Sequence, residues 1–279
     1  MKNKQFLTFL FSISFCFFNN AQNIEKVKGN RNLTIEQSYI NSFHTIIVDE
    51  DFEIDLIYNN EPSVEIEADE NLHEFIVFEV RDSILSFNKT RRITSKKKLH
   101  IKVFYDDYLS TIETREDAEI YSISNINLAN VNLITSGSSK AELTIKTDNF
   151  NFEGLDKSKT RLNVTADSTK VVLNSNSKLE ALINSPIVKT DLYQRAQATI
   201  EGDCDDLLLR TDNTSKFTGK NFTTKNCNLI CEMDSDAILE ITDAITLEAS
   251  GSSAVYLYNN PKIIVNRLTE NSKIQKKEK

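Results

Sequence analysis

Hydrophobic and polar residues alternate along nine similar segments, which recur every 17 to 23 residues from about residue 108 to the end of the chain. In the second segment, Ala141, Leu143 and Ile145 alternate with polar residues and follow a Ser-Gly-Ser-Ser turn at 136–139. Side chains of a strand point to opposite faces in turn, so each segment predicts a strand, a polar corner and a second strand. Aligning the first inward residues after the corners gives the column Ala118, Ala141, Thr160, Leu179, Ala196, Phe217, Ala237, Val255 and Ile274.

Other positions repeat with this column. A serine stands two residues before it in seven of the nine segments, and Glu116 and Gln194 take that place in the first and fifth. Lysine or arginine directly precedes the column in six segments, and an apolar residue stands eight positions before it in seven. A period of this length is typical of stacked units that are each too small to bury their own apolar face. We therefore expect equivalent residues to stack about 4.8 Å apart, with the serine hydroxyls bonded to one another along one corner.

The repeat predicts an all-β protein, a parallel β-solenoid of about nine rungs of roughly 19 residues over residues 106–275. A leucine-rich repeat has a similar period, but its leucine and asparagine pattern is absent. An antiparallel sandwich is the other alternative, and the regular spacing inside each repeat favours the solenoid over it. The chain has only six glycines and three prolines, so Ser, Asn and Asp must form most of the turns.

Residues 22–105 are patterned differently. Strand-like runs at 43–48, 52–58, 64–68, 75–80, 83–87 and 99–105 are separated by turn residues. They predict a small β-hairpin-rich region that packs on the first rung as a cap. A solenoid needs a cap because its open end exposes apolar side chains and unpaired strand edges.

Residues 1–21 have the pattern of a secretory signal peptide. Lys2 and Lys4 precede a mostly apolar run that is too short to span a bilayer, and Ala21 stands at the expected cleavage site. Cys16 would allow a lipoprotein, but Phe15 stands where a small residue is expected. We therefore expect an exported protein, in the periplasm or at the cell surface.

The remaining chain is acidic, with 31 basic and 41 acidic residues and a net charge of −10. This charge argues against nucleic acid as a partner. No second long apolar run follows the signal, so we expect no membrane span. Residues 276–279 form a short basic tail.

Three cysteines lie beyond the signal. Cys204 and Cys227 have similar offsets in adjacent rungs, which would allow a disulfide between them in an oxidising compartment. Cys231 follows Cys227 by four residues on one strand, roughly 13 Å away, which is too far for a direct bond. A zinc site would need further ligands, and no histidine follows residue 100. We expect no metal and no cofactor.

The sequence contains no evident catalytic constellation. His44, His73 and His100 adjoin apolar residues of strand-like segments, which is typical of structural histidines. Motifs for phosphate loops, nucleophile elbows and zinc proteases are absent. A glycoside hydrolase needs two facing carboxylates, and the nearest candidates, which also suit a weak calcium contact, lie in turns that favour Asp for backbone bonding. These candidates are Asp203, Asp205, Asp206, Asp234 and Asp236.

A basic cluster stands out in this acidic chain, because residues 89–98 contain six Lys or Arg side chains. Two interpretations remain open: a contact for an anionic surface such as an acidic or phosphorylated glycan, or a solvated hairpin tip. The candidate ligand contacts are Arg91, Arg92, Lys96, Lys97 and Lys98.

The order of several segments resembles the head GIN domain family of autotransporter adhesins, found in the envelopes of Bacteroidetes-type bacteria. The segments are FHTI at 43–46, VEIEADENL at 64–72, SILSF at 83–87, LHIKV at 99–103 and SGSSAVYLY at 250–258. The resemblance implies a β-helical fold similar to pectin-lyase-like solenoids but without their catalytic residues, and a role in adhesion. The family's usual Ser-Gly corner persists here at 136–139 and 250–253, whereas Asp, Asn and Lys replace it elsewhere. That departure leaves a shared glycine-corner binding surface unsupported.

We therefore expect an exported, noncatalytic binding or adhesion module of the bacterial cell envelope. Its partner is unknown; a cell-surface glycan and an envelope protein are the candidates, and the lack of tryptophan weakens a carbohydrate groove. The alternative is an envelope scaffold or signalling accessory that self-associates through the solenoid ends. A β-helix carbohydrate-active enzyme is the third hypothesis, and it requires the aspartates named above to converge.

Overall fold

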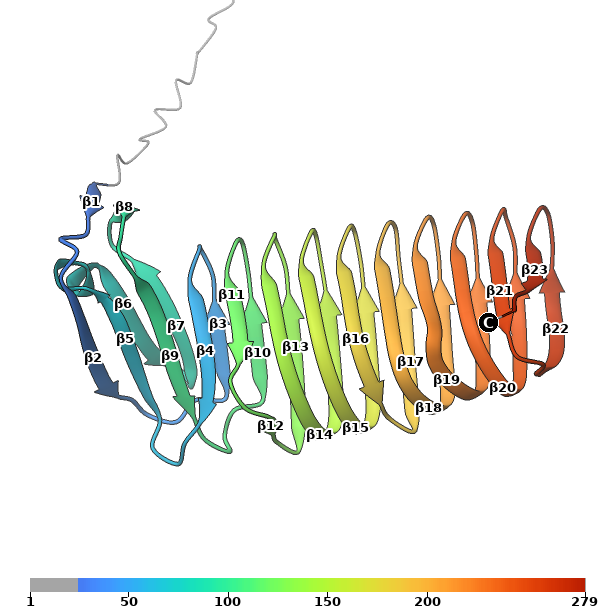
Figure 1. Cartoon of the computed structure of the whole chain (residues 1–279), viewed down its shortest axis with the longest axis horizontal. Helices are drawn as coiled ribbons and strands as arrows, with labels where there is room; N and C mark the ends of the chain where they lie inside the picture. The colour runs from blue at the N-terminus through green and yellow to red at the C-terminus, as the bar shows by residue number, and fades with distance from the viewer. Residues whose placement is uncertain (1–24, 279) are drawn as a thin grey trace, which may run out of the picture.

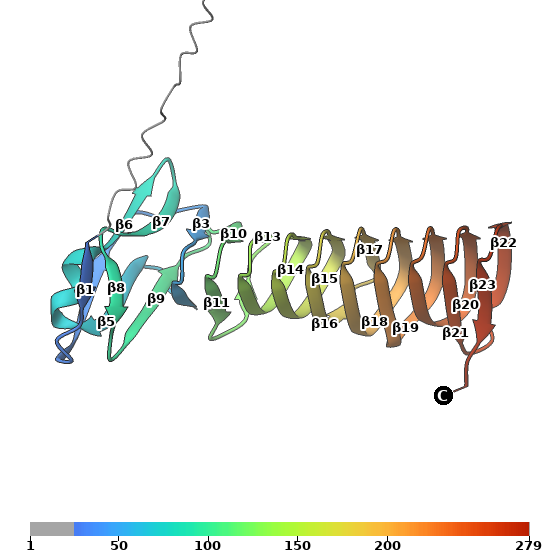
Figure 2. The ribbon, with the colours of Figure 1, turned by 90° about the horizontal axis from the view of Figure 1, so that it is seen from above.

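The computed structural model describes residues 25–278, which form an elongated stack of β-rungs with a strand-rich head at the N-terminal end (Figure 1). The predicted signal peptide, residues 1–21, lies outside the described residues. Neighbouring strands of the stack pair in parallel from rung to rung. The predicted parallel β-solenoid with a β-rich N-terminal region is therefore confirmed. Figure 2 shows the two sides of the stack running along one axis.

The N-terminal region contains nine strands and one short 3₁₀ helix among the described residues. They are β1 (Lys26–Lys28), β2 (Leu33–Tyr39), β3 (Thr45–Val48), β4 (Glu53–Tyr58), β5 (Ser63–Asp69), η1 (Glu70–Phe75), β6 (Ile76–Arg81), β7 (Ile84–Lys89), β8 (Arg92–Ser95) and β9 (Leu99–Tyr105).

The remaining strands form the rest of the stack. They are β10 (Thr111–Thr114), β11 (Glu119–Ser122), β12 (Ile126–Asn127), β13 (Asn130–Thr135), β14 (Lys140–Gly154), β15 (Lys159–Leu173), β16 (Lys178–Asn184), β17 (Ile187–Leu192), β18 (Gln197–Thr211), β19 (Lys216–Cys231), β20 (Asp236–Ala249), β21 (Ala254–Tyr258), β22 (Lys262–Leu268) and β23 (Lys273–Lys276).

The observed register corrects the sequence alignment in two rungs. Ala141 stacks on Ile120 instead of Ala118, and Leu179 stacks on Ala198 instead of Ala196. Ala118 and Ala196 therefore occupy the serine position of their rungs, and the exceptions Glu116 and Gln194 disappear. The corrected column is Ile54, Ile120, Ala141, Thr160, Leu179, Ala198, Phe217, Ala237, Val255 and Ile274.

Large and small side chains alternate in this column around Phe217. Phe217 is fully buried between Ala198 and Ala237. A Cβ at Gly219 would lie 2.7 Å from the Phe217 ring, so the glycine makes room for the aromatic side chain. Close packing of this kind leaves little space for a rung of different volume.

The serine column is buried, but its hydroxyls do not bond to one another as the sequence predicted. Ser139 accepts a hydrogen bond from the Thr114 hydroxyl at 2.9 Å, and Ser158 accepts one from Thr135 at 3.0 Å. Ser177 donates to the backbone carbonyl of Asn174 at 2.7 Å, within its own corner. Ser139, Ser158 and Ser177 thus pair with buried polar groups, where an unpaired group would be costly, whereas the buried Ser253 hydroxyl has no hydrogen-bond partner.

One residue of each corner adopts a left-handed backbone conformation. Ten such residues stack along the edge, and eight of them are not glycine. They are Glu50, Glu116, Gly137, Asp156, Ser175, Gln194, Asn213, Met233, Gly251 and Glu270, with φ between 52° and 74°. Backbone hydrogen bonds join neighbouring corners, for example from Ser252 to Met233 at 2.6 Å.

The cap is inserted between the first two rungs along the chain. β3 and β4 already pair in parallel with β10 and β11, so the solenoid ladder reaches into residues 22–105. The chain then leaves the stack and adds β7 beside β3 and β9 beside β4 on the far side. β6 and β5 pair antiparallel with these strands, and β2 with β5. The buried side chains Leu72 and Phe75 of η1 close this end.

Candidate functional site: a charged cleft beneath the cap

The predicted basic cluster does not form a hairpin tip. β7, which precedes it, pairs with β3, whereas β9, which follows it, pairs with β4. Between them, β8 pairs in parallel with the N-terminal strand β1. The cluster therefore spans the two sides of the stack and forms the wide corner of the outermost rung.

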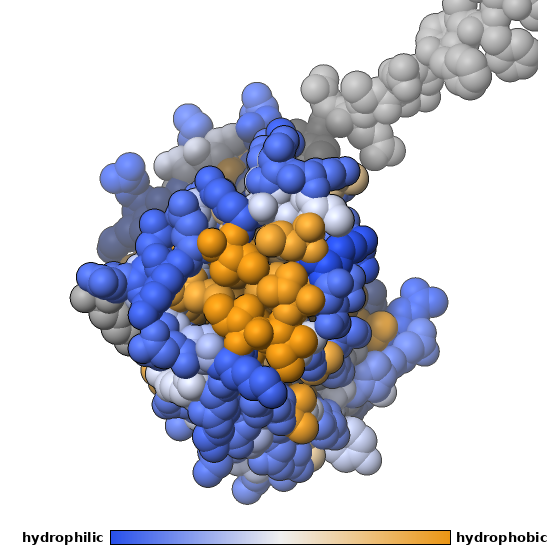
Figure 3. Space-filling model, turned by 90° about the vertical axis from the view of Figure 1, so that its right-hand side faces the viewer, coloured by the Kyte–Doolittle hydropathy of each residue, from blue (hydrophilic) through white to orange (hydrophobic). Residues whose placement is uncertain are grey.

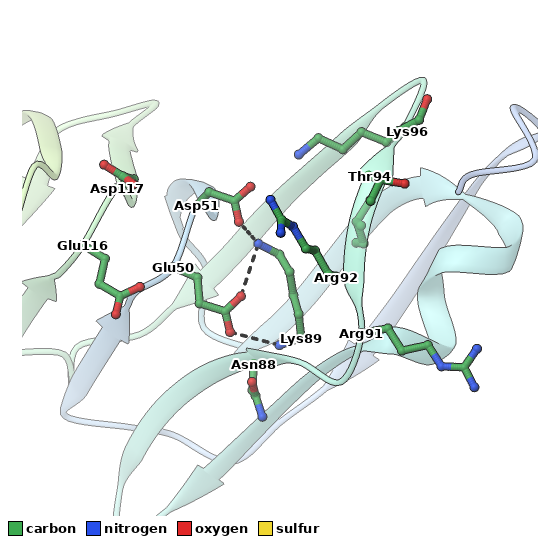
Figure 4. A pocket seen from close by; sticks show the side chains of 12 residues that line it. Glu50, Asp51, Asn88, Lys89, Arg91, Arg92, Thr94, Lys96, Glu116 and Asp117 are labelled. Atoms are coloured by element: carbon green, nitrogen blue, oxygen red, sulfur yellow. Dashed lines mark hydrogen bonds and ion pairs between the residues drawn. The ribbon is translucent and has the colours of Figure 1, made fainter. Parts of the chain in front are cut away.

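This wide corner forms one wall of a cleft of about 820 Å³, and the tight corners of the next two rungs form the other. Figure 4 shows the basic side chains opposite the acidic ones. The basic wall contains Lys89, Arg91, Arg92 and Lys96, and the acidic wall contains Glu50, Asp51, Glu116 and Asp117. The cleft has the size of a small-ligand pocket and balanced charge.

Lys89 holds the two walls together. Its side chain is 8% exposed, its ammonium lies 3.4 Å from a Glu50 carboxylate oxygen and also bonds to Asp51, and its backbone amide donates to Glu50 at 3.3 Å. The ammonium also lies 4.1 Å from the centre of the Phe52 ring. Burial lowers the pKa of Lys89, against the opposing effect of Glu50. Lys89 therefore forms structural ion pairs with Glu50 and Asp51 at the base of the cleft.

Two cations and two carboxylates of the cleft form no ion pair of the kind that Lys89 forms. Arg92 and Lys96 are exposed, as are Glu116 and Asp117, and none of these side chains forms a hydrogen bond or ion pair within residues 25–278. Packing around the Lys96 ammonium still lowers its pKa, with Glu53 acting in the opposite direction. Figure 4 shows Arg92 and Lys96 extending toward the acidic wall. The cleft thus offers free positive charge on one side and free negative charge on the other.

The other three predicted contacts lie differently. Arg91 points away from the acidic wall, lies 3.1 Å from Glu25 and stacks 4.5 Å from the Phe75 ring centre (Figure 4). Lys98 pairs with Glu67 at 2.6 Å, outside the cleft. Lys97 donates its backbone amide to Asp69 at 2.8 Å. The structure therefore brings Arg91, Arg92 and Lys96 to one cleft and leaves Lys97 and Lys98 outside it.

Sequence reasoning missed the acidic wall. Glu50 and Glu116 are equivalent left-handed corner residues, although 66 positions separate them, because the cap is inserted between their rungs. Burial raises the pKa of the neighbouring Asp49, and the charges of Glu50 and Glu116 raise it further. The repeat would have predicted this stack if residues 45–58 had been aligned with the later corners.

The three histidines occupy structural positions in the cap. The His73 ring lies 3.0 Å from the Thr34 hydroxyl, and the His100 ring lies 2.9 Å from Asp55. His44 contacts the hydroxyl of its neighbour Thr45 at 2.7 Å. None of these lies in the charged cleft.

The cysteines of the described chain are free and buried. Cys204 stacks on Thr224, whereas Cys227 stacks on Leu207, so their offsets differ by three residues. Burial raises the pKa of the Cys204 thiol to about 12 and raises those of Cys227 and Cys231 as well. The disulfide between Cys204 and Cys227 that the sequence allowed is not formed in this structure.

The acidic residues proposed for glycoside hydrolysis are spread over different corners. Asp236 stacks over Lys216 and hence over Gln197 at the start of β18, whereas Asp203 follows six residues later on that strand. Six strand residues span roughly 20 Å. Asp205 pairs with Lys225 at 2.7 Å, and Asp206 accepts a hydrogen bond from Asn226 at 3.2 Å. These carboxylates therefore do not face one another across a common site.

Residues 25–278 hold no group of three or more His, Cys, Asp or Glu side chains placed to bind a metal ion. No helix in this part of the chain is long and apolar enough to cross a membrane.

The fold and the cleft define a capped parallel β-solenoid. The sequence matches the family described as "putative auto-transporter adhesin, head GIN domain" over residues 42–185 and 163–261, and the chain belongs to this family. The family resemblance found in the sequence is thereby confirmed. No curated protein matches the chain.

Solved structures share the fold at low sequence identity. A putative adhesin from Parabacteroides distasonis is 15% identical, with a TM-score of 0.66 over 90% of this chain and 100% of the other. One from Parabacteroides merdae is also 15% identical, with a TM-score of 0.62 over 90% and 99%. A structure titled putative lipid binding protein, from P. distasonis, is 13% identical, with a TM-score of 0.58 over 90% and 99%.

Proposed function

We propose that this protein is an exported, noncatalytic binding module of the bacterial envelope, and that it binds its partner in the cleft beneath the cap. The observation that carries the proposal is the pair of free cations, Arg92 and Lys96, opposite the free carboxylates of Glu116 and Asp117. Membership of an adhesin family and the separation of the candidate catalytic aspartates support a binding role.

The charge arrangement favours a ligand that carries both signs. A purely anionic glycan would meet the carboxylates of Glu116 and Asp117 within the same cleft, and like charges at short range oppose binding. A polypeptide segment with acidic and basic side chains can satisfy both walls. We therefore favour an envelope protein over an acidic glycan as the partner.

The test is a binding screen of residues 22–279 against three probes. These are a displayed library of peptides with mixed charge, soluble polygalacturonate, and phosphatidylethanolamine vesicles, whose headgroup also carries both charges. The vesicles are included because one structure of similar fold is titled "putative lipid binding protein". We expect selection of peptides that carry both charges, and enrichment of polygalacturonate binding or failure of all three probes would contradict the proposal.

Variants of each wall then locate the site. We expect R92E/K96E and E116Q/D117N each to weaken binding of a selected peptide about tenfold, which corresponds to about 1.4 kcal/mol. The matched control is K159E/K178E, which makes the same charge change on exposed residues of the solenoid side. A loss of affinity in the control as large as in R92E/K96E would show that binding follows net charge and not the cleft.

A further inference from the structure

The two ends of the solenoid are closed to different degrees. At the N-terminal end, η1 buries Leu72 and Phe75 between the last strands. At the C-terminal end, β22 and β23 pair with the preceding rung on one edge only. Within the described chain, nothing covers the residues of this last rung that continue the core columns.

Those residues form an apolar patch. Ile263, Val265 and Leu268 are 47%, 46% and 47% exposed, although the residues on which they stack, Ile245, Leu247 and Ala249, are fully buried. Figure 3 looks onto this end and shows the apolar surface gathered at its centre, within a polar rim. An apolar patch beside unpaired strand edges is a typical docking surface.

The charge of this end differs from that of the rest of the protein. Residues 262–278 contain five basic and two acidic residues, a net charge of +3, whereas residues 25–261 have a net charge of −14. A partner for the C-terminal end should therefore be acidic at its rim.

The edge strands and η1 at the N-terminal end of a second copy have this character, apart from the basic wide corner formed by residues 89–98. Each of the two sheet sides that ends in β22 or β23 begins at an edge strand of the cap, β6 or β2 respectively. The segments 33–39 and 61–80 of this end contain eight acidic residues and no Lys or Arg, and Arg81 follows at the end of β6. Two of the eight, Glu67 and Glu65, pair with Lys98 and Lys102. The edge strands also expose apolar side chains, namely Ile35 and Tyr39 on β2 and Val77 on β6.

We propose that the C-terminal end of one copy docks on the N-terminal end of the next. β22 then lies beside β6 in antiparallel orientation, and β23 beside β2 in parallel orientation, because β6 opposes the direction of β7 and β2 shares that of β9. Contact between two C-terminal ends would bring two positive rims together, and contact between two N-terminal ends would bring two acidic edges together. A head-to-tail contact does not close on itself, so it yields an open linear array.

Sedimentation velocity of residues 22–279 tests the arrangement over a range of about 5 to 200 µM, because association follows mass action. We expect dimers, trimers and longer species whose average mass keeps rising with concentration. Raising the salt from about 0.05 to 0.5 M should weaken association about tenfold or more, because it screens the complementary rims. A monomer throughout, a species that stops at two copies, or association strengthened by salt would each overturn the proposal.

Charge reversal provides the matched test. Lys262 and Lys273 lie on β22 and β23, and Glu74 and Glu79 lie on η1 and β6; all four side chains are exposed. We expect K262E/K273E and E74K/E79K each to remain monomeric alone and to associate when mixed, because reversed tails then meet reversed heads. K159E/K178E, on the solenoid side, should assemble like the native chain. Association of either end variant alone, or no association of the mixture, would refute head-to-tail docking, and recovery on mixing also shows that both variants are folded.

Discussion

Replacing Met233 with glycine should stabilise this protein, although glycine usually weakens regular structure. Met233 has a φ of 63° at its corner and its side chain is 61% exposed. A left-handed conformation costs a non-glycine residue roughly 1–2 kcal/mol. Glycine avoids this cost, but its unfolded chain has more freedom to lose, worth about 0.5–1 kcal/mol. The expected net gain for Met233→Gly is about 0.5–1 kcal/mol, because the exposed side chain contributes little packing.

The assay is equilibrium unfolding in urea and by heat, followed by the β-sheet circular dichroism signal. For a chain of this size, the gain corresponds to about 1–3 °C in melting temperature. The triple variant Q194G/M233G/E270G should gain about 1.5–3 kcal/mol, since the three corners lie far enough apart for nearly additive effects. Gln194 and Glu270 have φ values of 58° and 61°.

Three controls separate backbone strain from other causes. Asn213 is also left-handed, with φ of 60°, but Asn tolerates this region, so Asn213→Gly should gain less than Met233→Gly. Asp234 lies beside Met233 and is not left-handed, so Asp234→Gly should be destabilising. Gly251→Ala should destabilise as well, because its Cβ would lie 2.4 Å from the Met233 carbonyl oxygen. Equal gains at Met233, Asn213 and Asp234 would refute the strain argument.

Three further predictions concern the core, the thiols and the solenoid side. Phe217→Ala should lower the free energy of unfolding by about 3–5 kcal/mol in urea titrations, because its small neighbours cannot fill the space; a loss below about 1 kcal/mol would contradict the packing. The free cysteines should not react with Ellman's reagent at pH 8 until the protein unfolds, because burial raises the pKa of Cys204 to about 12. Because the pKa of the folded Cys204 thiol exceeds the unfolded value of 9.0, its contribution to the free energy of unfolding is fully present below pH 9.0 and declines as the pH rises toward 12. Rapid labelling of the folded protein would disprove the burial. Lys159→Glu should stabilise by a few tenths of a kcal/mol at low salt, because Lys159 stacks between Lys140 and Lys178, and thermal melts should show the gain fading at high salt.

The outward rows hold ion pairs that join neighbouring rungs. Glu142 and Glu180 bracket Arg161, at 2.9 and 3.5 Å, whereas Lys140 pairs with Glu119 at 2.5 Å. The hydrogen bonds from Lys140 and Tyr121 lower the pKa of Glu119. The lysine column itself could be predicted from the repeat, but its partners depend on side-chain reach across rungs, which spacing alone does not give.

Much of the fold could be predicted because every rung of the solenoid buries the same positions, so the alternation of apolar and polar residues recurs in the sequence with each rung. The alignment failed only where Ala118 and Ala196 replace the serine of the corner, and it moved by two residues in both rungs. A shift of two leaves every side chain on the same face of the strand, whereas a shift of one would have placed polar residues in the core. Hydrophobic periodicity therefore could not detect this error, and the corner serine that marks the register elsewhere is replaced by alanine in both rungs.

The charged cleft and the open end lie where the repeat is interrupted, and this explains why sequence reasoning reached them only in part. Inside the stack, each rung finds its backbone partners and its apolar neighbours in the next one, so a repeating sequence satisfies its own contacts. At the cap, the inserted segment places Lys89 and Lys96 against Glu50 and Glu116, which come from the two rungs that the insertion separates. At the other end, Val265 has the side chain of a core residue, but within residues 25–278 no further strand stacks on it and it is 46% exposed. The repeat predicts the stacked rungs of the solenoid. The charged cleft and the exposed apolar end arise where a rung has no equivalent rung beside it, and those positions depend on the path of the chain and not on the period of the sequence.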